Sequence, residues 1–148
     1  MKKVFVTRKL LTSNDKRISK IWEAKLNPKD KIYSQHELIE LSKDCDGILC
    51  SIVDKFDAET INKLYHKVKI ISNFAVGFGN IDIEAASKRN IAVTNTPEVL
   101  TDATAEIAML IILGACRRAT EGMQWVKNKN WKWSADFLLG RQLSGSKL

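Results

Sequence analysis

The sequence predicts an α/β protein built on a doubly wound parallel sheet. Short runs of β-branched and other apolar residues recur along the first two thirds of the chain, and each is followed by a segment with apolar residues at helical spacing. Ser, Asp and Asn stand where those helices would begin. Strands that alternate with helices at this interval form parallel βαβ units, which close as right-handed crossovers with helices on both faces of a sheet.

The first elements of this pattern lie between residues 3 and 51. Residues 3–7 predict a strand, residues 13–20 the helix after it, and residues 21–24 a second strand. Residues 34–37 (Ser-Gln-His-Glu) have the S-x-x-E form of a capping box, so we expect a helix to begin there. Residues 47–51 (Gly-Ile-Leu-Cys-Ser) then predict a short buried strand.

The same alternation continues to Pro97. Asp57 is placed to cap the next helix, and residues 68–72 (Val-Lys-Ile-Ile-Ser) predict a fourth strand. A further helix is expected to open at Asn80 and run to residue 89, before a fifth strand over residues 91–94. The expected fold is therefore flavodoxin-like.

From residue 101 the character of the chain changes. Residues 101–115 predict a helix that is apolar on every side in its second half. Because it is shorter than the roughly 20 residues that span a bilayer, we expect protein layers to bury it. The helical pattern continues through Met123 and Trp125.

The last segment predicts an extended arm over residues 131–139 and, over residues 140–148, a turn that enters a strand. We therefore expect two parts. Residues 1–100 form an incomplete flavodoxin-like substrate-binding domain, and residues 101–148 form a linker helix and an arm that lead into an absent Rossmann domain.

Composition argues against several functional classes. The formal charge is +7, yet the lysines are scattered and no aromatic residues alternate with them as a base-stacking surface would require, so a nucleic-acid partner is not expected. The apolar run near the N-terminus is too short for a signal peptide or a membrane span. We expect a cytoplasmic protein with no membrane partner.

Cysteine and histidine spacing gives no metal site. Cys45, Cys50 and Cys116 lack a C-x-x-C spacing, and His36 and His66 lie too far away to complete a zinc cluster. Reduced, partly buried thiols are the expectation. Neither histidine is assigned a proton-transfer role.

Residues 72–82 (Ser-Asn-Phe-Ala-Val-Gly-Phe-Gly-Asn-Ile-Asp) are the most informative stretch. Two glycines follow a predicted buried strand and precede a helix. Ligands of open α/β sheets bind outside the carboxyl ends of the strands, and free backbone N–H groups at a helix start favour anions, which indicates an anion site at Val76 and Gly77. The alternative is a tight chain reversal with Gly77 and Gly79 at positive φ. The stretch is not a G-x-G-x-x-G fingerprint, because Asp82 occupies the third glycine position.

Three strings carry a family resemblance. They are residues 73–82, residues 85–97 (Ala-Ala-Ser-Lys-Arg-Asn-Ile-Ala-Val-Thr-Asn-Thr-Pro) and residues 99–106 (Val-Leu-Thr-Asp-Ala-Thr-Ala-Glu). Together they resemble D-2-hydroxyacid dehydrogenases of the glyoxylate and hydroxypyruvate reductase type. The resemblance extends over practically the whole chain, from Val4 to Gly145.

The resemblance implies roles for individual residues. In that family a flavodoxin-like substrate-binding domain carries an inserted Rossmann domain that binds NAD or NADP, and the backbone amides that match Val76 and Gly77 hold the substrate carboxylate. Thr104 matches a position near the nicotinamide; a first-turn hydroxyl bonded locally within its helix explains it about as well.

Two further comparisons with the family concern the same sheet edge. Leu49, Cys50 and Ser51 end a predicted strand there, so we expect Cys50 and Ser51 to line the substrate pocket. Gly79 stands where the family commonly has aspartate, which leaves open how the loop is held in place. Glu98 replaces a common glycine.

The family's dinucleotide fingerprint, and its catalytic arginine, glutamate and histidine, lie beyond the stretch that matches residues 143–148. No catalytic residue is therefore assigned. The expected function is that of a truncated or split NAD(P)-dependent oxidoreductase acting on the CH–OH group of D-2-hydroxy acids, inactive alone. Its expected partners are a small 2-oxo or 2-hydroxy acid and either a second copy or a complementing nucleotide-binding half.

A second hypothesis is a non-catalytic module that binds a small carboxylate or dimerises through the linker helix, a role made conceivable by family relatives that act as transcriptional corepressors. A nucleic-acid binder rests on net charge alone and ranks last.

Overall fold

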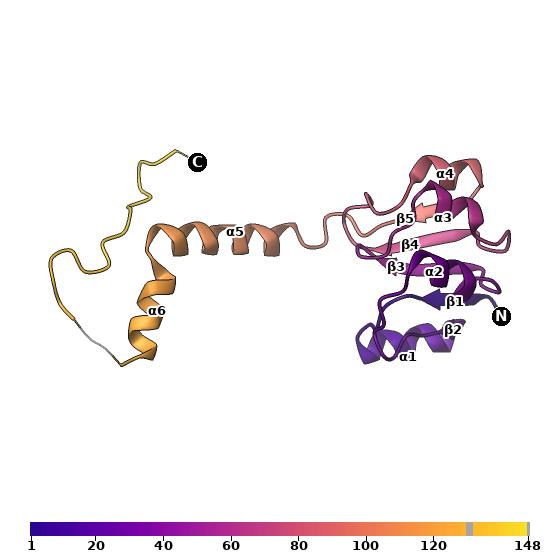
Figure 1. Cartoon of the computed structure of the whole chain (residues 1–148), viewed down its shortest axis with the longest axis horizontal. Coiled ribbons are helices and arrows are strands. Elements are labelled where there is room, and N and C mark those ends of the chain that lie inside the picture. The colour runs from indigo at the N-terminus through magenta and orange to yellow at the C-terminus, as the bar shows by residue number, and fades with distance from the viewer. Residues whose placement is uncertain (130–131, 148) are drawn as a thin grey trace. The chain divides into compact units, whose positions relative to one another are not determined.

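Five parallel strands form the centre of the unit that residues 1–99 make (Figure 1), in a computed structural model that describes residues 1–129 and 132–147. The strands lie side by side in the order β2-β1-β3-β4-β5. This is the strand order of flavodoxin-like sheets, so the predicted parallel α/β class is confirmed. The strands are β1 (Lys3–Val6), β2 (Glu23–Lys25), β3 (Gly47–Ser51), β4 (Ile70–Phe74) and β5 (Ala92–Thr94).

One face of the sheet carries the core. Side chains alternate along a strand, so Phe5, Ile48 and Ile71 point to the same face, where they meet α2 (Gln35–Leu41), α3 (Ala58–Lys63) and α4 (Ile83–Lys88). Figure 1 shows these three helices together and apart from α1 (Thr12–Ile21). The fully buried residues of this core include Leu38, Phe56, Ile61 and Ala86.

Helix α1 lies over the opposite face. Ile18 of this helix and Trp22, which directly follows it, line a cavity of about 460 Å³ with Val4, Leu49 and Ser72, which alternate along their strands with the core residues. Helices therefore lie on both faces of the sheet, as the doubly wound prediction requires.

Helix α2 begins at the predicted capping box. The Ser34 hydroxyl accepts from Glu37 N at 3.3 Å, and Ser34 N donates to the Glu37 carboxylate at 2.9 Å. Two backbone donors at the helix start, Glu37 N and Ser34 N, are satisfied in this reciprocal way.

Removing this cap is expected to cost stability. Ser34→Ala should lower the free energy of unfolding by about 1 kcal/mol, since Glu37 N loses its acceptor. Urea unfolding followed by circular dichroism would measure the change, with Ser87→Ala on α4 as the comparison because the Ser87 side chain caps no helix in the described residues. An unchanged unfolding midpoint for Ser34→Ala would contradict this account.

Some predicted boundaries were wrong. Helix α4 begins after Asp82, whose carboxylate accepts from Ala85 N at 2.8 Å, and not at Asn80, whose side-chain amide is engaged elsewhere. Strand β4 begins at Ile70 rather than at residue 68, because Val68 N bonds to Tyr65 O in the preceding turn. Strand β2 begins at Glu23 rather than at residue 21 and ends at Lys25 rather than at residue 24.

The chain divides into two units, Met1–Val99 and Leu100–Leu148. The second contains α5 (Thr101–Cys116) and α6 (Ala119–Lys127). The predicted helix does not run unbroken through Met123, because Arg118 adopts a left-handed conformation with φ of 53° and separates the two helices. No side chain of α5 is buried by the residues that the structure describes.

The predicted arm and final strand also differ from the structure. Residue 131 lies outside the described residues, and residues 135–138 form a turn in which Phe137 N donates to Ser134 O at 3.0 Å. Residues 140–147 contain a turn at residues 144–145 and no strand. Among the described helices, none is both long and apolar enough to cross a membrane.

Candidate functional site

A cavity of about 450 Å³ opens at the carboxyl ends of the strands. Its position at the β1/β3 switch, where successive connections leave in opposite directions, is where open α/β sheets place their ligands. It is lined by residues that follow β1 and β2 together with the ends of β3 and β4: Arg8, Lys9, Leu10, Leu11, Asn14, Asp30, Ser51 and Phe74.

Positive charge at this cavity is partly balanced. The Arg8 guanidinium donates to both carboxylate oxygens of Asp30, at 2.8 Å each, and Lys9 N donates to the same carboxylate at 3.0 Å. The guanidinium, followed by the Lys9 amide, holds the pKa of Asp30 well below its usual range. Lys9 is a second basic residue that lines the cavity.

The loop after β4 has its carbonyl groups held by protein donors. Ala75 O accepts from Thr96 N at 2.9 Å, Val76 O from the side-chain amide of Asn95 at 2.7 Å, and Gly77 O from the side-chain amide of Asn73 at 2.9 Å. These bonds come from residues before and after the loop. Residues 75–79 contain Val76 and Gly77, where the sequence predicts a carboxylate-binding site, and are called the substrate loop for that expectation.

The amide groups of the substrate loop are unengaged. Among the described residues, no protein acceptor lies within hydrogen-bond distance of the N–H groups of Val76, Gly77 or Phe78. All three residues are exposed. Gly77 and Gly79 do not adopt positive φ, so the alternative of a tight reversal through two left-handed glycines is wrong.

Asn80 joins the substrate loop to the loop after β3. Its side-chain amide donates to Ser51 O at 3.1 Å and to Asp54 O at 2.9 Å, and its side-chain oxygen accepts from Asn73 at 3.1 Å. At Gly79 a Cβ would meet nothing within 4 Å. The loop is therefore held by asparagine amides, and there is open space at Gly79.

Asp54 lies beneath this junction and is 2% exposed. Its Oδ2 accepts from the Thr7 hydroxyl at 2.7 Å, from Ser51 N at 2.8 Å and from the Ser51 hydroxyl at 3.1 Å. Its Oδ1 is buried without a partner among the described residues. Asp54 thus ties the ends of β1 and β3 together and fixes the Ser51 side chain.

The structure brings three of the expected substrate residues to one edge. Ser51 lines the carboxyl-edge cavity, and Val76 and Gly77 lie on the neighbouring loop that Asn80 ties to it. The Cys50 side chain points into the core instead: it is 2% exposed, and its thiol donates to the Asn73 side-chain oxygen at 3.5 Å. A direct contact of this thiol with a ligand does not fit its burial.

The burial of Cys50 predicts its reactivity. Desolvation, followed by the charge of Asp54, raises the pKa of the Cys50 thiol to about 12, and thiolates are the reactive form. In native protein treated with iodoacetamide near neutral pH, Cys116, which is partly exposed, should be alkylated well before Cys45 and Cys50. Peptide mass spectrometry would measure this, with urea-unfolded protein as the control. Equal rates for the three thiols would overturn the prediction.

Thr104 belongs to the second unit. Its hydroxyl and its backbone N–H both donate to Leu100 O, at 2.9 and 3.0 Å. This is the local helix bond expected as the alternative explanation. The role near a nicotinamide stays a prediction.

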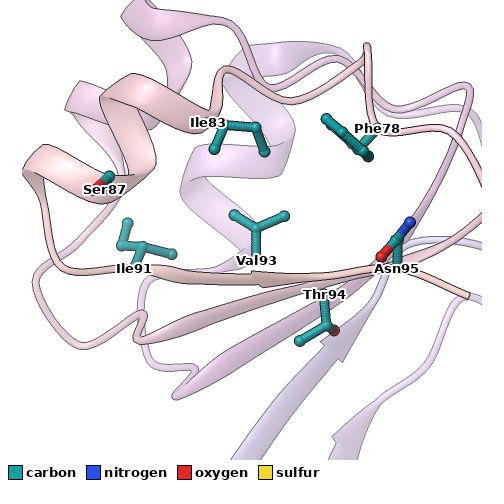
Figure 2. A pocket seen from close by; sticks show the side chains of 7 residues that line it. All are labelled: Phe78, Ile83, Ser87, Ile91, Val93, Thr94 and Asn95. Carbon is teal, nitrogen blue, oxygen red and sulfur yellow. The ribbon is translucent and has the colours of Figure 1, made fainter.

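A second cavity, of about 360 Å³, lies between α4 and β5. Figure 2 shows Val93 pointing toward Ile83 of α4, and Thr94 pointing to the other side of the strand. Phe78 and Asn95 also line it, so it borders the substrate loop. No titratable side chain lines this cavity, which suits packing better than chemistry.

The asparagine and Asp54 contacts were not identified from the sequence. The only available signal was that Asn73 and Asn95 directly follow predicted strands and that Asn80 stands at a predicted helix start. Within the described part of the chain, no group of three or more His, Cys, Asp or Glu side chains gathers as metal ligands.

Comparison with known proteins points in one direction. The family model described as D-isomer specific 2-hydroxyacid dehydrogenase, catalytic domain, matches residues 4–137. A glyoxylate reductase of Thermococcus litoralis is 40% identical over 99% of this chain, and a glycerate dehydrogenase of Hyphomicrobium methylovorum is 34% identical over 99%. The chain spans 45% and 46% of these two relatives.

Solved structures give the same result. A protein from a Polaromonas species, described as an NAD-binding D-isomer specific 2-hydroxyacid dehydrogenase, superposes with a TM-score of 0.86 at 32% identity. The superposition covers 98% of this chain and 46% of that one. A protein from Thermus thermophilus superposes with a TM-score of 0.82 at 32% identity, covering 95% of this chain and 45% of that one.

Proposed function

This chain belongs to the D-isomer specific 2-hydroxyacid dehydrogenase family, and from that membership we propose that its substrate loop binds the carboxylate of a small 2-oxo or 2-hydroxy acid. The observation that carries the proposal is the set of unengaged amides at Val76 and Gly77 at the carboxyl edge of the sheet. Backbone N–H groups in such a position are suited to an anion.

The cavity beside the loop supports this assignment. Its volume of about 450 Å³ is ample for an acid of two or three carbons, and Ser51 and Lys9 are among the residues that line it. The Ser51 hydroxyl donates to Asp54, so its oxygen is left to accept a hydrogen bond from a ligand hydroxyl and not to bind the carboxylate. We propose glyoxylate or hydroxypyruvate as the substrate, on the strength of relatives named glyoxylate reductase and glycerate dehydrogenase.

NAD or NADP would supply the hydride in such a reduction. The 148 residues contain no G-x-G-x-x-G, and the described residues include no histidine beside the substrate loop, so the residues present do not fit a nicotinamide nucleotide. We therefore assign no step of hydride or proton transfer to them. We propose that reduction needs a nucleotide-binding half that these 148 residues do not contain.

A non-catalytic role is the second candidate. Helix α5 exposes large apolar side chains, among them Ile107, Leu110 and Ile111, which favours association through this helix. The carboxylate site would then serve binding without turnover. The two candidates share the site and differ in whether a nucleotide-binding half restores reduction.

Carboxylate binding is tested on the 148-residue chain by amide NMR. Titration with oxamate, a stable analogue of a 2-oxo acid, should shift the Val76 and Gly77 amides with saturation at a Kd on the order of 1 mM, which corresponds to about −4 kcal/mol. Oxamide has a closely similar shape without the charge and should leave both amides unmoved. Absence of saturable shifts at these two amides would refute the proposed carboxylate site.

A further inference from the structure

We propose that Asn95 is a positioning residue that aims the Gly77 amide at the substrate carboxylate, with Asn73 doing the same for the Phe78 amide. The inference rests on the proposed carboxylate site and adds the residues that shape it. Its basis is the set of hydrogen bonds to the carbonyl groups of the substrate loop.

The planarity of the peptide unit links each carbonyl to the next amide. In a trans peptide the C=O of one residue and the N–H of the following residue lie in one plane and point in opposite directions. A donor that holds the carbonyl therefore also sets where the next N–H points. No peptide bond of the described chain is cis, so this holds throughout the substrate loop.

Two neighbouring donors act on the first half of the loop. Thr96 N holds Ala75 O at 2.9 Å, and the Asn95 side chain holds Val76 O at 2.7 Å. The Val76 and Gly77 amides must then both point away from the segment that contains Asn95 and Thr96. Two donors that point to the same side suit the two oxygens of one carboxylate.

Asn73 fixes the second half. It is 1% exposed, and its side-chain amide donates to Gly77 O at 2.9 Å and to the Asn80 side chain at 3.1 Å, so both of its amide hydrogens are engaged. Because Asn73 lies beneath the loop, the Phe78 amide is directed outward. The loop thus presents three consecutive amides, one more than the family resemblance implied.

Asn95 is the residue to test, because it is only half-buried and its replacement spares the core. In Asn95→Ala the Val76 carbonyl loses its donor and the peptide plane that contains the Gly77 amide is free to rotate. Asn62→Ala is the matched control: Asn62 is an exposed asparagine of α3 whose side chain makes no hydrogen bond to the described residues.

The expected result in the 148-residue chain has three parts. The NMR order parameter of the Gly77 amide should fall from about 0.85 to below about 0.6 in Asn95→Ala. The Kd for oxamate should rise about tenfold or more, which is a loss of about 1.4 kcal/mol. The thermal midpoint, and all three readouts in Asn62→Ala, should stay at wild-type values.

Each other outcome decides the matter. If wild-type protein binds oxamate and Asn95→Ala binds it equally well with a rigid Gly77 amide, the positioning role is wrong and the carboxylate site stands. If wild-type protein does not bind, the proposed function fails, and the order parameters alone decide whether Asn95 holds the loop. Should Asn95→Ala unfold, Asn95→Asp, which has the same size and no amide donor, must reproduce the loss of Gly77 order; a rigid Gly77 would then overturn the proposal.

Discussion

Replacing Phe56 with alanine is expected to lower the free energy of unfolding of the Met1–Val99 unit by about 3–5 kcal/mol. The Phe56 ring is 0% exposed and packs in the core between the sheet and helices α2 to α4. Its removal loses the transfer free energy of the ring and leaves a cavity that the neighbours fill only in part. Since small domains are stable by about 5–15 kcal/mol, this one change should remove a large share of the total.

Phe74 provides the matched control, because it is also a phenylalanine but is 59% exposed. Phe74→Ala should change the unfolding free energy by no more than about 0.5 kcal/mol. Urea unfolding with tryptophan fluorescence and circular dichroism would measure both variants. A Phe56→Ala protein as stable as Phe74→Ala would show that the core between the sheet and helices α2 to α4 does not hold the domain together.

Phe56 also affects the candidate site. Its backbone N–H donates to Asn80 O at 2.8 Å and its carbonyl accepts from Asp82 N at 2.8 Å. The buried ring thus anchors Phe56, and the Phe56 backbone holds Asn80. Asn80 in turn joins the substrate loop to the loop after β3. We expect carboxylate affinity to fall in Phe56→Ala even in the folded fraction.

The sequence was sufficient to predict the sheet and most caps, because these depend on short-range signals. The Ser34 capping box and the Asp57 cap involve residues three positions apart, and the structure contains both. The start of α4 shows where such short-range signals fail, because the sequence predicted Asn80 as the first residue and the structure has Asp82 as the cap. Both residues are good caps, and only the tertiary contacts of Asn80 with Ser51 and Asp54 decide which one is available.

The candidate site was predictable in position but not in construction. A Gly-x-Gly sequence after a buried strand located Val76 and Gly77, since a strand end and a helix start are both local features. The groups that shape the loop come from far along the chain: Asn95 lies 19 positions from Val76, and Asn80 lies 29 positions from Ser51. Asparagine beyond a strand is also common in turns, so its type alone did not indicate this role.

Turnover is the property on which the largest effect is expected. The 148-residue chain should show no NAD(P)H-dependent reduction of glyoxylate, which amounts to loss of the entire enzymatic acceleration, typically about 10⁶-fold or more. The proposed site offers backbone amides to a carboxylate, and these groups do not move a hydride. His36 is exposed on α2, and His66 is exposed just before β4, at the amino ends of the strands and hence at the opposite edge of the sheet from the substrate loop.

Adding a nucleotide-binding half as a separate protein distinguishes the two candidate functions. The Thermococcus litoralis glyoxylate reductase is 40% identical to this chain over the region that the two share, so its nucleotide-binding half is the natural complement. NAD(P)H oxidation with glyoxylate measures the outcome. Turnover that appears on mixing, and that weakens at low glyoxylate in Asn95→Ala but not in Asn62→Ala, would tie the reaction to the substrate loop. Turnover by the 148-residue chain alone would contradict the proposal that reduction needs a nucleotide-binding half, because the hydride and the proton would then have to come from residues that show no means of supplying them.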